Sequence, residues 1–539
     1  MAAREAGGYW QAVGLRALAA FLVLWTPFFV FSAHRGHPLP PLTLAGAALA
    51  AALLALVLAA LCGRHGKLRQ AILFTCLVAL ALDVQFDWFE KAAAYAVAVA
   101  LLGLFWLLSR HLSAILATAF AALLVSTALI APPEPGGDTA AAAQGTGVPG
   151  EGNSRRRIVH LILDEHAGIE GIPDDLPGGS ALQAELVAFF TSNGFRVFGS
   201  AISEYATSRD SISGILNFTA GPRPYERYRG REPYILTQNA YFDALAAAGY
   251  RIAVTQATDL DYCSEQRTAV DRCHTYAHDS TRWLADATLA DGEKLKIFFG
   301  LYLQLSDIAE SLFKAYARLE RSQQGGPLDL PALPEWDAGL SSINAMLAFD
   351  RFIEEAGSGE ANRLYFTHLL LPHGPYAFDA ACRLRGDSST WANHRPPFMK
   401  DSSEAQRARS YRYYFEQIRC VKTRLQTLFD WLKAARAYDD AIIIVHGDHG
   451  SRIAQVAPRA ENFERLAAQD FRDAFATLFA VKAPGVEPGY DAAPAPASRL
   501  LAEAIGRPDL VRNPTGQLSV YLEEDDDEPR KPVLWTYSD

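Results

Sequence analysis

Two strand-length apolar runs, far apart in the sequence, each end in acidic and imidazole side chains. IVHLIL (158–163) is followed by DEH, and AIIIV (441–445) is followed by HGDHG. Carboxylates and imidazoles that emerge together from strand ends are ligands for a divalent cation, and the glycines beside Asp448 and His449 allow a sharp turn. Taken singly, either segment is better explained as a solvated loop. Together they indicate a metal site containing Asp164, Asp448 and His449.

A cluster of hydroxyl side chains precedes a helix-like run in SEYATSRDSISGILN, residues 203–217. A Ser or Thr at a helix N-terminus lies in positive potential beside free backbone N–H groups, which favours an alkoxide nucleophile and a bound phosphate. Judged alone, this cluster is better explained by helix capping, which Ser and Thr perform very often.

An irregular loop surrounds His373 in LLPHGPY, residues 370–376, where two prolines and a glycine follow an apolar run. Such a histidine can donate to an anionic substrate or act as a general acid or base. On local sequence alone, a structural histidine bonded to the backbone is equally well supported.

The pattern of the elements that must position these residues predicts an α/β domain. Short apolar runs alternate with amphipathic stretches such as residues 411–432, which predicts a mainly parallel sheet between helices. In such sheets ligands bind at the carboxyl ends of the strands, which is where the acidic and imidazole residues fall.

The first quarter of the chain is almost free of charge and predicts about five transmembrane helices. The segments are residues 13–32, 42–62, 71–86, 92–108 and 112–131, each near the length that a hydrocarbon core requires. The third is the weakest, since Asp83 and Asp87 lie near its end. We therefore expect a transmembrane domain (1–135), a flexible Pro/Gly/Ala-rich linker (136–157) and a catalytic domain (158–539).

The loop charges predict the orientation of this helical domain. Lys and Arg favour the cytoplasmic side. They gather before or at the start of the first segment, between the second and third, and between the fourth and fifth, as Arg4, Arg16, Arg64, Lys67, Arg69 and Arg110. With five spans, everything after residue 131 lies outside the cytoplasm. For a bacterium, this predicts a multi-pass protein of the inner (cell) membrane whose catalytic domain lies in the periplasm or at the cell surface.

The six cysteines indicate the redox environment of the chain, and the net charge of −10 indicates which partners to expect. Two cysteines lie in or beside apolar runs, and the other four form two loose pairs, Cys263 with Cys273 and Cys382 with Cys420. In an exported domain these pairs predict disulfides; reduced thiols and a zinc site are the alternatives, and zinc is the weaker because no C-x-x-C spacing occurs. The acidic balance predicts no nucleic-acid partner.

The order of these motifs resembles that of the alkaline phosphatase superfamily. Five N-terminal spans before an exported domain resemble lipoteichoic acid synthases and lipid A phosphoethanolamine transferases. Residues 203–217 resemble membrane-bound sulfatase-like hydrolase/transferase proteins, whose pattern is approximately S-N-Y-x-x-T-x-x-S-L-x-S-x-L-N with Thr as nucleophile. The register is fixed by Ser203, Tyr205, Ser211 and Asn217, and it places Ser208 on that Thr.

The resemblance implies a role for each candidate residue. Ser208 is the nucleophile, with Thr207 as second choice. Asp164, Asp448, His449 and the Ser208 hydroxyl fall on positions that hold one divalent metal, with zinc or manganese fitting the oxygen and nitrogen donors. His373 falls on a position that contacts the transferred group.

Two departures limit what the resemblance implies. Type I sulfatases require C/S-x-P-x-R, whereas Ser208 is followed by Arg-Asp-Ser, so "sulfatase" describes the family rather than the reaction. Phosphoethanolamine transferases carry Glu where Asp164 stands, so their headgroup specificity does not transfer.

The expected function is metal-dependent transfer of a phospho-headgroup from a membrane phospholipid to a cell-envelope glycan or lipid through a covalent Ser/Thr intermediate. The alternatives are a membrane-anchored phosphatase, phosphodiesterase or sulfuric ester hydrolase with the same residues and water as acceptor, and a scaffold with a decayed site. The intact set of Asp, Ser, His and Asp-His counts against the scaffold.

Overall fold

The computed structural model describes residues 2–34, 41–62, 66–86, 91–129, 156–230, 233–265, 270–278, 280–284, 287–304, 340–388, 402–512, 518–524 and 528–535. The chain divides into two compact units. The first contains Met1–Gly137, Ser280–Asp337 and Gly386–Ser389; the second contains Asp138–Asp279, Ala338–Arg385 and Thr390–Asp539. A segment that the sequence assigns to the catalytic domain is thus part of the helical unit. Most of the expected linker, residues 136–155, lies outside the described residues.

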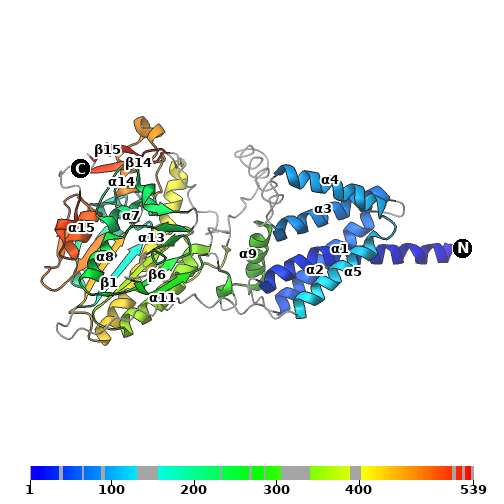
Figure 1. Ribbon diagram of the computed structural model, residues 1–539, viewed down its shortest axis with the longest axis horizontal. Helices are drawn as coiled ribbons and strands as arrows, with labels where there is room; N and C mark the ends of the chain where they lie inside the picture. The colour runs from blue at the N-terminus through cyan, green and yellow to red at the C-terminus, as the bar shows by residue number, and fades with distance from the viewer. Residues whose placement is uncertain are drawn as a thin grey trace. The chain divides into compact units, whose positions relative to one another are not determined.

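Each of the five apolar segments forms a helix, coloured blue to cyan in Figure 1. They are α1 (Ala2–His34), α2 (Pro41–Leu61), α3 (Lys67–Phe86), α4 (Lys91–Leu107) and α5 (Leu112–Leu129). Three stretches are long and apolar enough to cross a membrane, namely Trp10–Ser32, Thr43–Leu61 and Leu112–Leu129, and α4 has a shorter apolar stretch, Tyr95–Leu107. Lys67, Arg69 and Asp83 dilute the apolar character of α3. These apolar helices indicate membrane anchoring.

Basic residues from separate segments of the chain converge at one end of this bundle. Arg16 of α1, Lys67 of α3 and Arg110, which precedes α5, line one hollow together with Gln70 and Ser113. The Gln70 amide donates to the Ser113 hydroxyl at 3.0 Å and so joins α3 to α5 there. The loops that the charge rule assigns to the cytoplasmic side therefore share one end of the bundle.

The second unit is built on an eight-stranded sheet. In spatial order its strands are β12 (Gly489–Asp491), β2 (Arg196–Phe198), β11 (Phe479–Lys482), β10 (Ile442–Gly447), β1 (Ile158–Leu163), β9 (Arg363–Leu369), β6 (Arg251–Ala257) and β8 (Val270–Tyr276). The β10–β11 and β11–β2 pairs are antiparallel, and the other neighbouring pairs are parallel. The prediction of a mainly parallel α/β domain is confirmed.

Helices cover both faces of this sheet (Figure 1). One layer contains α7 (Ser208–Asn217), α8 (Ala240–Ala247) and α15 (Ala497–Ala504), whose apolar residues share a buried core with strand residues such as Ile162 and Phe366. The other contains α6 (Gly179–Ser192), α11 (Ser341–Ser358) and α13 (Glu404–Ala434), with Phe189 of α6 stacked on Phe429 of α13. Because helices cover both faces, the central strands are shielded from water, which explains why their residues are mostly apolar.

Smaller elements complete the fold. Three minor sheets pair β3 (Ala201–Ile202) with β13 (Ala495–Pro496), β4 (Tyr228–Arg229) with β5 (Tyr234–Leu236) and β7 (Leu260–Asp261), and β14 (Ser519–Leu522) with β15 (Lys531–Leu534). Two further helices are α9 (Asp291–Gln304), in the first unit, and α14 (Ala468–Phe475).

Both expected disulfides are present, Cys263–Cys273 and Cys382–Cys420. Cys62 and Cys76 are free. The first bridge closes a separation of 10 residues at β8, and the second joins α13 to the chain that follows β9 across 38 residues. Both pairs are therefore oxidised, as the sequence predicts for an exported domain.

Candidate active site and metal centre

The parallel register of the central strands brings the two acidic motifs together. Leu163 at the end of β1 lies opposite Gly447 at the end of β10. Asp164 and Asp448 each follow directly, so both carboxylates leave the same edge of the sheet. Asp164, Asp448 and His449 are buried, and one ligand atom from each lies within 4.8 Å of the others. The three residues that the sequence nominates as metal ligands therefore meet.

Each carboxylate is held through one oxygen and leaves the other without a hydrogen bond. Oδ1 of Asp448 accepts from the backbone N–H groups of Glu165 at 3.0 Å and His449 at 2.9 Å. Oδ2 of Asp164 accepts from the Ser208 hydroxyl at 3.2 Å. The other two oxygens, Oδ1 of Asp164 and Oδ2 of Asp448, are buried and have no hydrogen-bond partner among the described residues. Buried oxygens without partners are costly unless a cation occupies the space between them.

The imidazole of His449 has the orientation of a metal ligand. Nδ1 lies 2.8 Å from the Gly450 carbonyl, which accepts only, so Nδ1 carries the proton. The Nε2 lone pair then faces the centre, 3.3 Å from Oδ2 of Asp448 and 3.3 Å from the Ser208 hydroxyl. A backbone carbonyl that fixes the tautomer in this way is the usual support of a metal-bound histidine.

The charge balance also fits a divalent cation. Burial raises the pKa of Asp448, and the neighbouring Asp164 carboxylate raises it further. Burial alone would also raise the pKa of Asp164, but His373, His368 and His449 outweigh it and hold that pKa well below its usual value. Two carboxylates this close repel each other when both are ionised, and a divalent cation removes that repulsion.

The nucleophile candidate lies at the N-terminus of α7. Thr207 has the extended conformation of an N-cap residue, and the Ser211 N–H donates to its carbonyl at 2.9 Å. Ser208 is the first helical residue, so its hydroxyl lies in the positive potential of the helix end. The Thr207 hydroxyl instead donates to Glu523 at 3.3 Å. Of the two adjacent hydroxyls, the structure therefore brings Ser208 to the candidate ligands.

A buried ionic cluster from the C-terminal hairpin supports this helix end. Arg530 donates to Oδ2 of Asp210 through Nε at 3.1 Å and Nη2 at 3.0 Å. Its Nη2 also lies 3.0 Å from Oε2 of Glu523, beside β14. Asp210 is in the first turn of α7, so the cluster ties the chain terminus to the turn that contains Ser208. Arg530 and Asp210 are separated by 320 residues, and their pairing has no local sequence signal.

We expect Glu523→Gln to change the pH dependence of stability. Burial, followed by the nearby Asp210 carboxylate, raises the pKa of Glu523 from 4.5 to about 7. When the pKa of a carboxyl is raised on folding, the folded protein becomes less stable as the pH increases through the range between the two pKa values, here 4.5 to 7. The glutamine variant lacks this loss, so its stability relative to the unaltered protein increases across that window by up to about 3 kcal/mol. Thermal unfolding of the full chain at pH 5 and pH 7.5 measures the change.

Glu524→Gln is the matched control for this experiment, because Glu524 is the next residue and its side chain is only partly buried. Its unfolding temperature should differ from that of the unaltered protein by the same amount at both pH values. A Glu523→Gln difference that is also independent of pH would contradict a raised pKa at Glu523.

His373 lies at the same edge of the sheet, beside Glu165. Its Nε2 is 3.6 Å from Oε1 of Glu165. Arg452 donates to the same carboxylate through Nε at 2.9 Å, and the Gly374 N–H donates to Oε2 at 3.3 Å. Asp164, Glu165 and His373 form a second buried group with closely spaced ligand atoms. The guanidinium of Arg452 compensates the negative charge of Glu165, so this carboxylate does not repel an anion. This side of the site is therefore suited to steady an anionic group beside the metal centre.

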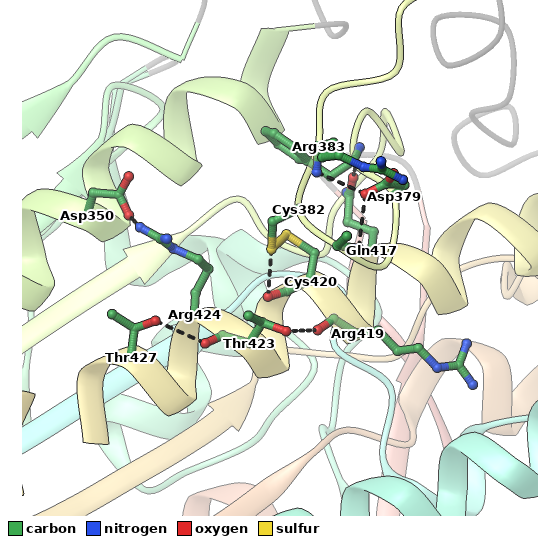
Figure 2. The surroundings of a disulfide bond; sticks show 12 residues. Asp350, Asp379, Cys382, Arg383, Gln417, Arg419, Cys420, Thr423, Arg424 and Thr427 are labelled. Carbon is green, nitrogen blue, oxygen red and sulfur yellow. Dashed lines mark hydrogen bonds and ion pairs between the residues drawn. A yellow bond between two sulfur atoms is a disulfide. The ribbon is translucent and has the colours of Figure 1, made fainter. Parts of the chain in front are cut away.

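Helix α13 holds the His373 loop in place. The Gln417 amide donates to the carbonyls of Pro372 at 3.1 Å and His373 at 3.0 Å. Its carbonyl accepts from the Phe378 N–H at 3.2 Å. One turn further along the helix, Cys420 is linked to Cys382 (Figure 2). The loop is therefore fixed to one face of α13 by a buried amide and a covalent bond.

Sequence reasoning missed three residues that complete the site. His368, on β9, has its Nε2 3.5 Å from Oδ2 of Asp164 and thereby borders the metal centre. Glu165 and Arg452 form the buried pair beside His373, and both have positive φ, at 62° and 55°. Glu165 directly follows Asp164, and Arg452 lies two residues after the Asp-His-Gly motif. The opposite charges beside the two motifs were therefore the available signal. His368 lies within an apolar strand and offers no such signal.

A mainly parallel sheet with a carboxylate and imidazole centre at its carboxyl edge, facing a hydroxyl at a helix N-terminus, is the arrangement of the alkaline phosphatase and sulfatase superfamily. The sulfatase family model matches residues 207–477, just over half of the chain, and the chain belongs to the sulfatase family. Among curated proteins, none matches the sequence significantly.

Solved structures with a similar fold are distant in sequence. The Bacteroides fragilis protein yidJ is 14% identical, with a TM-score of 0.42 over 72% of this chain and 86% of that chain. The C-terminal periplasmic domain of EcEptC from Escherichia coli is 13% identical, with a TM-score of 0.42 over 71% and 93%. The phosphonate monoester hydrolase of Agrobacterium radiobacter is 13% identical, with a TM-score of 0.40 over 69% and 82%.

Proposed function

We propose that the chain transfers a phospho-headgroup from a membrane phospholipid to a hydroxyl of a cell-envelope glycan or lipid, through a covalent intermediate on Ser208. The observation that carries this proposal is the Ser208 hydroxyl in the first turn of α7, 3.2 Å from Asp164 and 3.3 Å from His449. An attacking hydroxyl is activated when its developing charge faces a metal centre and a helix N-terminus.

The residues divide the reaction into two displacements. When bound, Zn²⁺ or Mn²⁺ at Asp164, Asp448 and His449 lowers the pKa of the Ser208 hydroxyl and polarises a phosphoryl oxygen. Ser208 Oγ forms a bond to phosphorus, and the bond from phosphorus to the diacylglycerol oxygen breaks. The Ser208 proton passes to solvent, while His373 protonates the departing diacylglycerol oxygen.

The second displacement restores the enzyme. The acceptor hydroxyl attacks phosphorus and gives its proton to His373, and Ser208 Oγ leaves and takes back a proton from solvent. Arg452, hydrogen-bonded to Glu165 beside His373, helps to hold the anionic phospho-group in place. The proton inventory is unchanged over the whole cycle.

Membrane anchoring and the sequence at the nucleophile favour a lipid donor over a sulfate ester. Apolar helices keep the catalytic unit on the membrane and raise the effective concentration of a lipid substrate. The residues after Ser208 are Arg, Asp and Ser, without the proline that type I sulfatases require two places on. We place the catalytic unit outside the cytoplasm, in a bacterial periplasm or at the cell surface, because the basic loops gather at one end of the bundle and both cysteine pairs are oxidised.

Intact-mass measurement of the full chain in phospholipid vesicles tests the proposal. We expect an adduct on Ser208 whose mass identifies the headgroup, together with an equal amount of released diacylglycerol. An adduct that decays into free headgroup phosphate, whatever glycan or lipid acceptor is added, supports the hydrolase alternative. Metal-loaded protein that neither forms an adduct nor releases diacylglycerol from any vesicle lipid contradicts lipid-headgroup transfer.

A further inference from the structure

Helix α9 comes from the middle of the catalytic sequence but packs in the helical unit. It lies between β8 and α11 in the chain, yet it belongs to the same compact unit as α1–α5. Phe298 and Tyr302 on its buried face pack against Phe28 of α1, with ring centroids 5.1 and 5.5 Å apart. Figure 1 shows α9, in green, lying across the helices of this bundle.

A largely apolar cavity of about 460 Å³ lies between α9 and the helices α1, α2 and α3. Its volume falls in the range of sites that hold small organic ligands, roughly 300–1,000 Å³. Apolar and aromatic side chains form nearly all of the lining, and one cation joins them at the α9 side. The lining includes Trp25, Phe28, Ala51, Leu80, Lys296 and Phe299.

The cavity lies toward the end of the bundle opposite the basic hollow. On α1 it begins at Val23, whereas the basic hollow ends at Arg16. On α3 it is lined by Leu77, Leu80 and Ala81, and the basic hollow by residues from Lys67 to Gln70. If the basic end faces the cytoplasm, the cavity opens to the outer leaflet, which is the leaflet that an exported lipid-using enzyme draws on.

Lys296 supplies charge where the cavity meets the polar surface of α9. Its side chain is 40% exposed and its Nζ lies 3.5 Å from Glu293 and 3.6 Å from Asp387. A cation flanked by two carboxylates at the edge of an apolar groove is complementary to a molecule with a hydrocarbon chain and a zwitterionic head that contains a phosphate and an amine. That combination is the chemistry of a glycerophospholipid.

We propose that this cavity holds an acyl chain of a diacylglycerophospholipid from the outer leaflet, with the lipid phosphate beside Lys296. The site would load the donor, and in that role it rests on the proposed function. Binding of the acyl chain itself does not depend on catalysis, so the two can fail separately.

The test uses the full chain in vesicles of phosphatidylethanolamine and phosphatidylglycerol that contain the same lipids with a photoreactive diazirine in one acyl chain. After illumination, mass spectrometry locates the labelled peptides. We expect labelling of the cavity-lining parts of α1, α3 and α9. Ala51→Trp fills the cavity and should reduce this labelling about tenfold, the effect expected when roughly two methylene groups lose their burial.

Ala45→Trp is the matched control, because Ala45 is an exposed residue of the same helix that does not line the cavity. It should leave the labelling unchanged. Equal labelling in the two tryptophan variants would overturn the proposal, as would labelling spread evenly over the lipid-facing helices. Absence of lipid label together with crosslinks between copies of the chain at α2 would assign the cavity to a protein contact, which also overturns it.

Ser208→Ala separates this inference from the proposed function. Cavity labelling that persists in this variant, when the unaltered protein forms no adduct with the same lipids, supports the lipid site and contradicts lipid-headgroup transfer. An adduct on Ser208 without labelling of the cavity contradicts the lipid site and leaves the transfer reaction supported.

Discussion

Ser208→Ala is expected to abolish the covalent adduct and to lower turnover at least about 10³-fold, because it removes the only atom that forms the bond to phosphorus. The fold and the metal content should stay largely unchanged. Asp164, Asp448 and His449 remain to hold the metal, and the two hydrogen bonds that the Ser208 hydroxyl loses are long, at 3.2 and 3.3 Å. Turnover of the vesicle lipid, the adduct mass and the unfolding temperature measure the three effects.

Thr207→Ala provides the neighbouring comparison. Its hydroxyl contacts Glu523 rather than the metal centre, so we expect a reduction of no more than about tenfold in turnover, with the adduct retained. Thr207→Ser, which keeps the hydroxyl, should restore most of the rate. Loss of the adduct in Thr207→Ala but not in Ser208→Ala would mean that the nucleophile is one residue earlier, although the reaction class would stand.

Asp448→Asn is expected to have opposite effects on the metal-free and metal-loaded protein. Without metal, the unaltered chain keeps Asp448 near Asp164, and burial and this neighbour raise the pKa of Asp448. The amide relieves that repulsion and can still accept from the backbone N–H groups of Glu165 and His449. The metal-free variant should therefore unfold at a higher temperature at neutral pH than the metal-free protein.

Adding Zn²⁺ or Mn²⁺ reverses the order. A cation at 100 times its dissociation constant stabilises the unaltered protein by about 2.7 kcal/mol, whereas the variant lacks a charged ligand and gains much less. Turnover of the variant should fall at least about 100-fold. Asp470→Asn is the control, since Asp470 is also buried but accepts from the backbone N–H groups of Gln455 and Val456. An equal metal-induced shift in Asp448→Asn and the unaltered chain would remove Asp448 from the metal centre.

The parts of the site that the sequence predicts are those encoded in short segments. A buried parallel strand ends where its apolar run ends, so the residue after the run must lie at the sheet edge, which is how Asp164 and Asp448 come together. The Ser208 hydroxyl is predictable in the same way, because it lies where a helix-like run begins. The order of β1 and β10 as direct neighbours could not be deduced from their own residues, because it depends on how the intervening segments pack.

The parts that the sequence does not predict depend on pairs that are remote in the chain. Arg530 is next to acidic residues of its own hairpin, and nothing local indicates Asp210 as its partner. The packing of α9 in the helical unit has the same origin, since its apolar face resembles that of any amphipathic helix in a soluble core. The antiparallel β11 also escapes prediction, because a four-residue apolar strand reads alike in both directions.

The bond between Cys382 and Cys420 has a consequence for when the enzyme becomes competent. Gln417 and this bridge fix the loop of His373 to α13, and the bridge forms only where thiols are oxidised. A newly made chain that is still in the reducing cytoplasm lacks the covalent half of that support. Under the localisation that we propose, oxidation after export is therefore the step that completes this support, which links maturation of the His373 loop to arrival on the outer side of the membrane.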